Sequence, residues 1–252
     1  MKKMKKSILS LIVVCAILAN VFMFSTVSVS AASSPQLNLV KGSNCFNVVW
    51  NKVAGAVKYR LYFGAVSPNG NGWRRFTVLT NSDISTYPKN TKSWQFLINS
   101  NSLKNRKWYA YGDDKNISTP SLNTRECYQC QVEALREGDK HIAWTNVGYV
   151  FLGVPQTTQK KVNSNTTNVI VNSPIISEGS VKYIYEIAYR PNSNYSYKTI
   201  GAQIYSKNFK TITFIFKYEG YRVIEYKVRT VVEKNGKKLA YGSWSSLSKI
   251  NW

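Results

Sequence analysis

The chain has 252 residues, and its 34 Lys and Arg against 12 Asp and Glu give a formal net charge of +22. Its single histidine and few acids leave little material for catalysis, since hydrolytic triads need a histidine and glycosidases need converging carboxylates. The sequence also contains no Gly-rich phosphate loop and no H-E-x-x-H zinc motif. We therefore expect a protein that is not an enzyme and that carries no cofactor or metal ion.

The first residues have the layout of a secretory signal peptide. Four lysines at positions 2, 3, 5 and 6 precede an apolar stretch from Ile8 to Phe24, and small residues follow up to Ala32. The alternative is that this stretch is kept as a membrane anchor; no later apolar run is long enough to span a bilayer. The long leader, the abundant Lys and Asn and the few acids suggest a Gram-positive bacterium. We predict a signal peptide at 1–32 and a secreted, extracellular protein, with association with the cell wall as one option.

Three cysteines follow the predicted signal peptide: Cys45, Cys127 and Cys130. Secretion permits disulfides, and an odd count leaves at least one thiol without a partner in the chain. We expect one structural disulfide, from Cys45 to either Cys127 or Cys130. Two alternatives stay open. A redox C-x-x-C pair would need a helix N-terminus where the sequence predicts a strand, and a zinc site would use the three cysteines and His141.

Three short motifs occur twice in the same order, which predicts a duplicated domain. The pairs are GAVKYRLY at 55–62 with GSVKYIYE at 179–186, YQCQVEAL at 128–135 with YKVRTVVE at 226–233, and HIAWTN at 141–146 with YGSWSS at 241–246. We predict one domain at 33–155, with a long insertion in its middle at 80–126, and a second domain at 156–252.

The repeated runs alternate apolar and polar residues, which is typical of β-strands with one buried side. In the run at 226–232, Lys227 and Arg229 lie on one face and the apolar residues around them lie on the other. Short runs rich in Val, Ile, Tyr and Thr, bounded by Asn, Gly and Ser, continue along the chain, and no amphipathic helix stands out.

The order of these runs resembles that of fibronectin type III domains. The motifs are VVWNKVAGAVKYRLY at 48–62, YQCQVEA at 128–134 and IAWTN at 142–146, then GSVKYIYEIAYR at 179–190, YKVRTVV at 226–232 and YGSWSS at 241–246. The resemblance implies an all-β fold of two tandem immunoglobulin-like (fibronectin type III-like) β-sandwiches after the signal peptide. It also implies that Tyr128 and Tyr226 are tyrosine-corner residues, whose hydroxyls bond to nearby backbone. The second copy departs from the pattern at Asn172, where the first copy has Trp50.

Basic residues of the second copy are predicted to share one sheet surface. These are Lys182, Lys198, Lys227, Arg229, Lys237 and Lys238. Like charges on neighbouring strands repel, so such a cluster favours an anion that offsets the repulsion. Outside a bacterial cell, the partner would be an anionic cell-wall polymer or glycan, or another extracellular protein; secretion makes nucleic acid a less expected partner. The alternative is a solvated face that discourages aggregation.

Aromatic residues of the first copy offer a different surface. Trp73, Trp94 and Trp108, with Tyr109 and Tyr111, lie in a turn and in the middle segment, where they could stack on sugar rings. The alternative is a satellite core packed under a long loop. We therefore expect a non-enzymatic binding or adhesion protein that uses its sandwich faces. A carbohydrate-binding module is the first alternative, and a secreted hydrolase with His141 against a carboxylate and a hydroxyl is the second.

Overall fold

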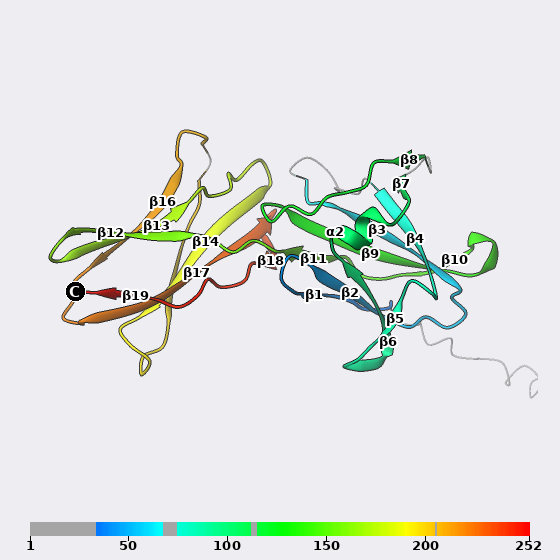
Figure 1. Ribbon diagram of the computed structural model, residues 1–252, viewed down its shortest axis with the longest axis horizontal. Helices are drawn as coiled ribbons and strands as arrows, with labels where there is room; N and C mark the ends of the chain where they lie inside the picture. Colours follow the sequence, from blue (N-terminus) through cyan, green and yellow to red (C-terminus); the bar gives the residue numbers. More distant parts are fainter. Residues whose placement is uncertain (1–33, 68–74, 112–114, 205) are drawn as a thin grey trace, which may run out of the picture. The chain divides into compact units, whose positions relative to one another are not determined.

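The computed structural model describes residues 34–67, 75–111, 115–204 and 206–252. Within them Pro35–Trp252 forms one compact unit that is almost entirely β-structure (Figure 1). The predicted signal peptide at 1–32, and its alternative as an anchor, lie outside the described residues. None of the helices in the described ranges is both long and apolar enough to cross a membrane.

The first sandwich consists of two antiparallel sheets. One sheet has the order β1-β2-β6-β5, and the other has the order β10-β9-β3-β4-β7-β8, with β11 also paired to β9. The strands are β1 (Leu37–Lys41), β2 (Phe46–Asn51), β3 (Lys58–Ala65), β4 (Arg75–Thr80), β5 (Ser85–Tyr87), β6 (Asn90–Ile98), β7 (Trp108–Ala110), β8 (Asn116–Ile117), β9 (Cys127–Leu135), β10 (His141–Trp144) and β11 (Gly148–Phe151).

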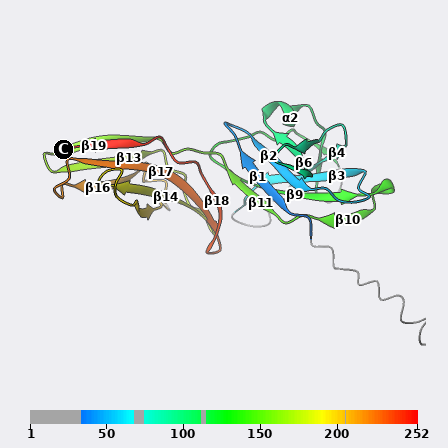
Figure 2. The same ribbon diagram turned by 90° about the horizontal axis from the view of Figure 1, so that it is seen from below.

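The second sandwich repeats this plan with fewer strands. One sheet has the order β12-β13-β16, and the other has the order β15-β14-β17-β18, with β19 also paired to β17. The strands are β12 (Thr157–Asn163), β13 (Thr166–Asn172), β14 (Val181–Arg190), β15 (Lys198–Ala202), β16 (Thr211–Lys217), β17 (Val223–Lys234), β18 (Lys237–Tyr241) and β19 (Ser248–Asn251). Figure 2 shows these strands from a second side. The predicted all-β fold of tandem sandwiches is confirmed.

The repeated motifs form equivalent strand pairs in the two sandwiches. The first motif enters β3 and β14, and the second motif forms β9 and β17; β3 pairs with β9, and β14 pairs with β17. The turn between β17 and β18 is made by Asn235 and Gly236, both with positive φ (52° and 78°). Two such residues suit the tight hairpin turns that match strand twist.

Alternation along each strand places the core where the pattern predicted it. Val169 and Val171 of β13 are 0% and 1% exposed, although Asn172 replaces the Trp of the first copy. In the first sandwich Trp50 contacts Tyr59 edge to face, with ring centroids 5.3 Å apart. The first two strands of the second copy, β12 and β13, therefore form without that Trp.

The middle segment at 80–126, predicted as a long insertion, contains regular structure. It contains β6, which pairs with β2 along its length and is part of the first sheet. It also contains a five-residue helix, α2 (Ser100–Lys104). Asn99 caps this helix: its side chain accepts from the backbone of Ser102, and the Ser102 hydroxyl accepts from the backbone of Asn99. A helix this short has too few residues to show a helical period in the sequence.

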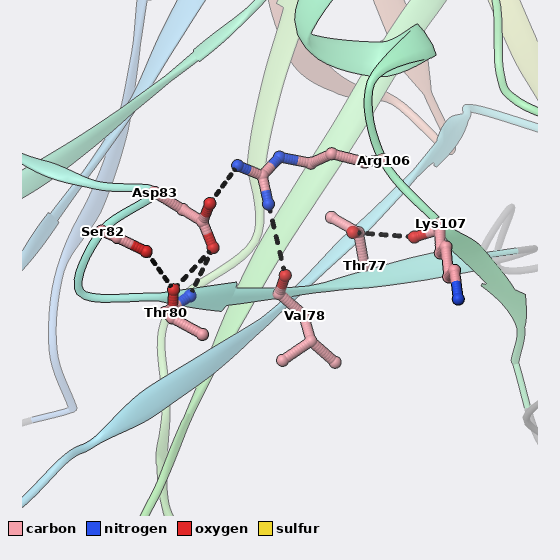
Figure 3. A network of polar contacts seen from close by, with 7 residues as sticks. All are labelled: Thr77, Val78, Thr80, Ser82, Asp83, Arg106 and Lys107. Atoms are coloured by element: carbon pink, nitrogen blue, oxygen red, sulfur yellow. Dashed lines mark hydrogen bonds and ion pairs between the residues drawn. The ribbon is translucent and has the colours of Figure 1, made fainter.

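A polar network fastens the segment after α2 to β4 (Figure 3). The Arg106 guanidinium donates to Asp83 at 2.6 Å, and Asp83 accepts from the backbone and the hydroxyl of Thr80 at 2.8 and 2.9 Å. The Thr77 hydroxyl donates to the carbonyl of Lys107 at 2.9 Å. The hydrogen bond from Arg106, with those from Thr80, lowers the pKa of Asp83 from its ordinary 3.8 to about 2.

This lowered pKa predicts a stability contribution that depends on pH. Because the folded-state pKa lies below the unfolded value, the contribution is complete above about pH 4 and is lost as the pH falls toward 2. We expect Asp83→Asn to lower the free energy of unfolding by about 1 kcal/mol at pH 7, and this difference to shrink toward zero at pH 2. Urea unfolding at pH 7, 4 and 2 measures it, with the exposed Glu137→Gln as control. An equal loss at all three pH values would contradict the prediction.

The predicted disulfide is not formed, and all three cysteines are free thiols. Cys127 and Cys130 stand three residues apart on β9, so their side chains point to opposite faces and enter different hydrophobic clusters. Burial raises the pKa of the Cys127 thiol to about 12 and raises that of Cys130 as well. Such thiols stay protonated, which argues against the redox alternative. No cluster of three potential metal ligands occurs among the described residues, so the zinc alternative finds no site there.

Of the two predicted tyrosine corners, the described residues show the one at Tyr128 and not the one at Tyr226. The Tyr128 hydroxyl accepts from the backbone N–H of Asn123 at 2.5 Å and donates to the carbonyl of Ser121 at 3.2 Å, as predicted. The Tyr226 hydroxyl instead accepts from the side chain of Gln159 at 3.0 Å. The prediction for Tyr226 is wrong because β12, the first strand of the second sandwich, brings that amide to the hydroxyl.

Candidate functional site

Five aromatic residues gather on the outer side of the larger sheet of the first sandwich. They are Tyr62, Phe76, Tyr109, Tyr111 and Trp144, and we call them the aromatic face. Alternation in β3 sends Tyr59, Leu61 and Phe63 into the core and leaves Tyr62 on the solvent side. The register then places Tyr62 opposite Phe76, and Phe76 opposite Tyr109.

Tyr62 is the centre of this aromatic face. Its ring centroid lies 5.0 Å from that of Trp144, 5.4 Å from Phe76 and 5.8 Å from Tyr111. These separations are typical of favourable aromatic pairs. Tyr62 is only 6% exposed although it points away from the core, whereas Tyr111 is 60% and Trp144 37% exposed. The cluster therefore covers its own centre and presents two rings to solvent.

A polar network around Glu133 fixes the position of the Tyr62 ring. The Tyr62 hydroxyl donates to Glu133 at 2.9 Å, and Nδ1 of His141 lies 3.1 Å from the other carboxylate oxygen. A guanidinium nitrogen of Arg60 lies 3.6 Å from the same carboxylate. Burial and the hydrogen bond to Glu133 raise the pKa of Tyr62 above its ordinary value. Tyr62 is therefore a fixed hydrogen-bond donor, and the Glu133 charge is compensated locally.

The same network bears on the hydrolase alternative. His141 does lie against a carboxylate, and a hydroxyl is bonded to that carboxylate, as this alternative requires. The hydroxyl, however, belongs to Tyr62 and donates to Glu133 rather than to His141. An activated nucleophile has to be bonded to its base, and a phenol with a raised pKa is a poor one. The arrangement supports the aromatic face rather than a catalytic triad.

A hollow of about 350 Å³ opens beside the central ring. Among the described residues it is lined by Tyr62, Tyr111, Gln131 and Trp144, and none of these four side chains is charged. The Gln131 amide donates to the carbonyl of Thr145 at 2.8 Å, which fixes its position. Sites for small ligands are typically hollows of this order of size, with aromatic walls and a few placed polar groups.

Of the three tryptophans predicted to stack on glycans, the two that the structure describes do not form a common exposed surface. Trp73 lies outside the described residues. Trp94 is half-buried, with the ammonium of Lys52 4.0 Å from its ring centroid. Trp108 is 1% exposed, and its Nε1 donates to the carbonyl of Leu103 at 3.0 Å. The assignment of Trp108 is wrong, because β7 turns this ring into the core.

Sequence reasoning missed Tyr62 as part of the aromatic face, and placed Trp144 only as the tryptophan of a closing strand. The alternation in KYRLYF at 58–63 contains the signal for Tyr62, since two outward positions there are Arg60 and Tyr62. The convergence with Tyr111 depends on how β7 joins the sheet edge beyond β4. No local pattern in the sequence specifies that pairing.

The six basic residues predicted for an anion-binding face all belong to strands of one sheet of the second sandwich. Four cations and three rings alternate there in a continuous stack, which we call the ladder: Arg190, Tyr197, Lys227, Trp244, Arg229, Tyr241 and Lys238. Each cation lies between 4.4 and 5.7 Å from the centroid of a neighbouring ring. Such contacts are attractive and separate like charges from each other.

Carboxylates inside the same sheet offset much of this charge. Glu186, 9% exposed, accepts from Arg229 at 2.7 and 2.8 Å and from Lys238 at 3.4 Å. Lys182 lies 3.5 Å from Glu233. The repulsion that favoured an external anion is therefore reduced within the protein. Lys198 and Lys237 begin β15 and β18 as exposed residues, and an anion site at the six basic residues stays a prediction.

Comparison with known proteins gives a likeness of fold. No family model and no curated protein matches the chain. A chicken interferon gamma receptor alpha chain is similar, with 10% identity and a TM-score of 0.34 over 86% of this chain and 97% of that one. A chain of a cytokine receptor complex is 10% identical with a TM-score of 0.43, over 86% and 96% of the two chains. Similarity this low says nothing about function.

Proposed function

We propose that this chain is a non-enzymatic extracellular binding protein and that the aromatic face is its ligand-binding surface. The observation that carries the proposal is the pair of rings, Tyr111 and Trp144, held in solvent around a buried Tyr62. Exposed aromatic clusters on a soluble protein mark interaction sites, and Trp and Tyr dominate binding energy where they occur.

The ordered contacts of Tyr62 and Trp144 favour a binding role for the exposed rings over an incidental exposure of apolar side chains. Tyr62 is fixed by its bond to Glu133, and Trp144 stands on β10 opposite Glu133 in the sheet register. A surface whose side chains are already ordered loses little conformational entropy when a ligand binds. Without the four lysines of the predicted signal peptide the net charge falls from +22 to +18, which still adds long-range attraction to anionic surfaces such as bacterial cell walls.

Binding to purified Gram-positive cell walls tests this proposal. We expect Trp144→Ala and Tyr111→Ala each to weaken binding about tenfold or more, because each removes one exposed ring. Leu97→Ala is the matched control: Leu97 is a large apolar side chain, 40% exposed, on β6 of the other sheet. All variants are first compared by circular dichroism and urea unfolding. Binding of both ring variants at wild-type strength would refute the proposal.

A second candidate is the binding of anionic wall polymers by the six basic residues predicted for the second sandwich. It is favoured by Lys227, which has cation–π contacts but no ion pair within the described ranges, and by the exposed Lys198 and Lys237. We expect the double variant Lys198→Ser and Lys237→Ser to weaken binding to walls that contain teichoic acid, and added salt to weaken it further. Unchanged binding at low salt would exclude this candidate.

A further inference from the structure

We infer that the ligand of the aromatic face is a neutral carbohydrate, with one pyranose ring seated in the hollow between Tyr111 and Trp144. This inference rests on the proposed function and names the class of ligand. It is carried by three properties of the hollow: its size, its charge and the kinds of group that line it.

The size of the hollow suits a sugar ring better than a protein surface. Its volume of about 350 Å³ lies near the lower end of the range for small-ligand sites. A stable protein–protein contact buries about 800 Å² on each partner, which is far more than four lining residues supply. A ring of a polysaccharide can enter the hollow while the rest of the chain continues along the sheet.

The electrostatics of the hollow favour a neutral ligand. None of the four lining side chains carries a charge. The nearest carboxylate, Glu133, already accepts from Tyr62 and lies against His141 and Arg60. An anionic sugar would therefore meet no unpaired cation among the described lining residues, and burying its charge without a partner would be unfavourable. This distinguishes the hollow from the basic residues of the second sandwich.

The lining groups match the two kinds of surface that a pyranose presents. The exposed rings of Tyr111 and Trp144 can pack against its C–H faces, where aromatic rings offer a large and rigid apolar contact. The Gln131 amide uses one donor on Thr145, and a primary amide has two donors and two acceptor lone pairs. The second N–H and the side-chain oxygen of Gln131 can therefore form hydrogen bonds with the hydroxyl or acetamido groups at the edge of a sugar.

Isothermal titration of the chain with defined hexasaccharides tests the inference. The probes are cellohexaose, chitohexaose and mannohexaose as neutral sugars and hexagalacturonate as the anionic one. We expect at least one neutral probe to bind and to compete with cell walls, and hexagalacturonate to bind at least tenfold more weakly. Trp144→Ala and Gln131→Ala should each weaken the neutral sugar about tenfold, while Trp144→Phe retains part of the affinity and Leu97→Ala retains all of it.

The outcomes separate this inference from the proposed function. If the ring variants lose binding to cell walls, but no neutral hexasaccharide binds or competes and protease digestion of the walls removes the binding, the ligand is a protein. That result would refute the carbohydrate inference but would leave the proposed binding function intact. Preferred binding of hexagalacturonate through Trp144 would also overturn the carbohydrate inference. If the ring variants bind walls as the wild type does, the proposed function falls and the inference falls with it.

Discussion

Replacement of Trp108 by alanine is expected to lower the free energy of unfolding by about 3–5 kcal/mol. The indole is 1% exposed, contacts Phe63 with ring centroids 5.9 Å apart, and donates its N–H to the carbonyl of Leu103. The variant would leave a cavity between β7 and β3 and a buried carbonyl without its donor. Few single changes in the first sandwich should cost more.

Urea unfolding followed by circular dichroism measures this loss, and Trp94→Ala is the control. Trp94 is half-buried on β6, so its removal should cost clearly less than that of Trp108. Trp108→Phe keeps an aromatic ring but loses the N–H, and should fall between the wild type and the alanine variant. A Trp108→Ala chain that unfolds at the wild-type urea concentration but no longer binds sugar would instead restore the stacking role that the sequence suggested.

Replacement of Arg229 by alanine is expected to cost about 2–3 kcal/mol, the second largest effect we predict. Its guanidinium lies 4.4 Å from the centroid of Trp244 and 4.5 Å from that of Tyr241, and it donates twice to Glu186. Because Glu186 is 9% exposed, loss of the arginine leaves a largely buried carboxylate with only the longer contact to Lys238. The segment at 242–247, which runs beside β17 without regular structure, would also lose a contact through Trp244.

A double-mutant cycle isolates the ion pair from the stacking. Arg229→Ala, Glu186→Gln and the double variant are compared by urea unfolding, and we expect a coupling energy above about 1 kcal/mol. Arg229→Lys keeps the charge but not the planar fork, so it should recover only part of the loss. Lys237→Ala, at an exposed position on β18, should change stability by less than about 0.5 kcal/mol. Additive effects in the cycle would show that the pair does not couple.

The ladder also affects how the anion-binding prediction is tested. Lys227 and Arg229 were candidate anion ligands, yet both are stacked between aromatic rings. Substitution of Arg229 is expected to destabilise the second sandwich, so a loss of binding in that variant would not identify a ligand contact. Lys198 and Lys237 are better positions, because they are exposed and contribute no ring contact to the ladder.

The positions of the main strands in the two copies followed from the local alternation of apolar and polar residues. The alternation in YQCQVEAL and YKVRTVVE predicted β9 and β17, and the structure has both strands with the apolar side buried. The twofold occurrence of the motifs predicted tandem sandwiches, since each repeated run has to bury the same face. Strand β6 of the middle segment was not predicted, because it is recognised as part of the sheet only through its pairing with β2, far away in the sequence.

For the candidate site, the sequence predicted the kinds of residue but not their arrangement in space. The sequence by itself determined an all-β chain with strong positive charge, alternating strands and many aromatic residues, because these depend on composition and on a period of two. Only the tertiary structure decided which rings face solvent: it turned Trp108 inward and brought Tyr111 and Trp144 around Tyr62. It also placed Glu186 beneath Arg229 and separated Cys127 from Cys130. Strand order and register set these neighbours, and both depend on contacts between residues distant in the sequence that no local pattern encodes.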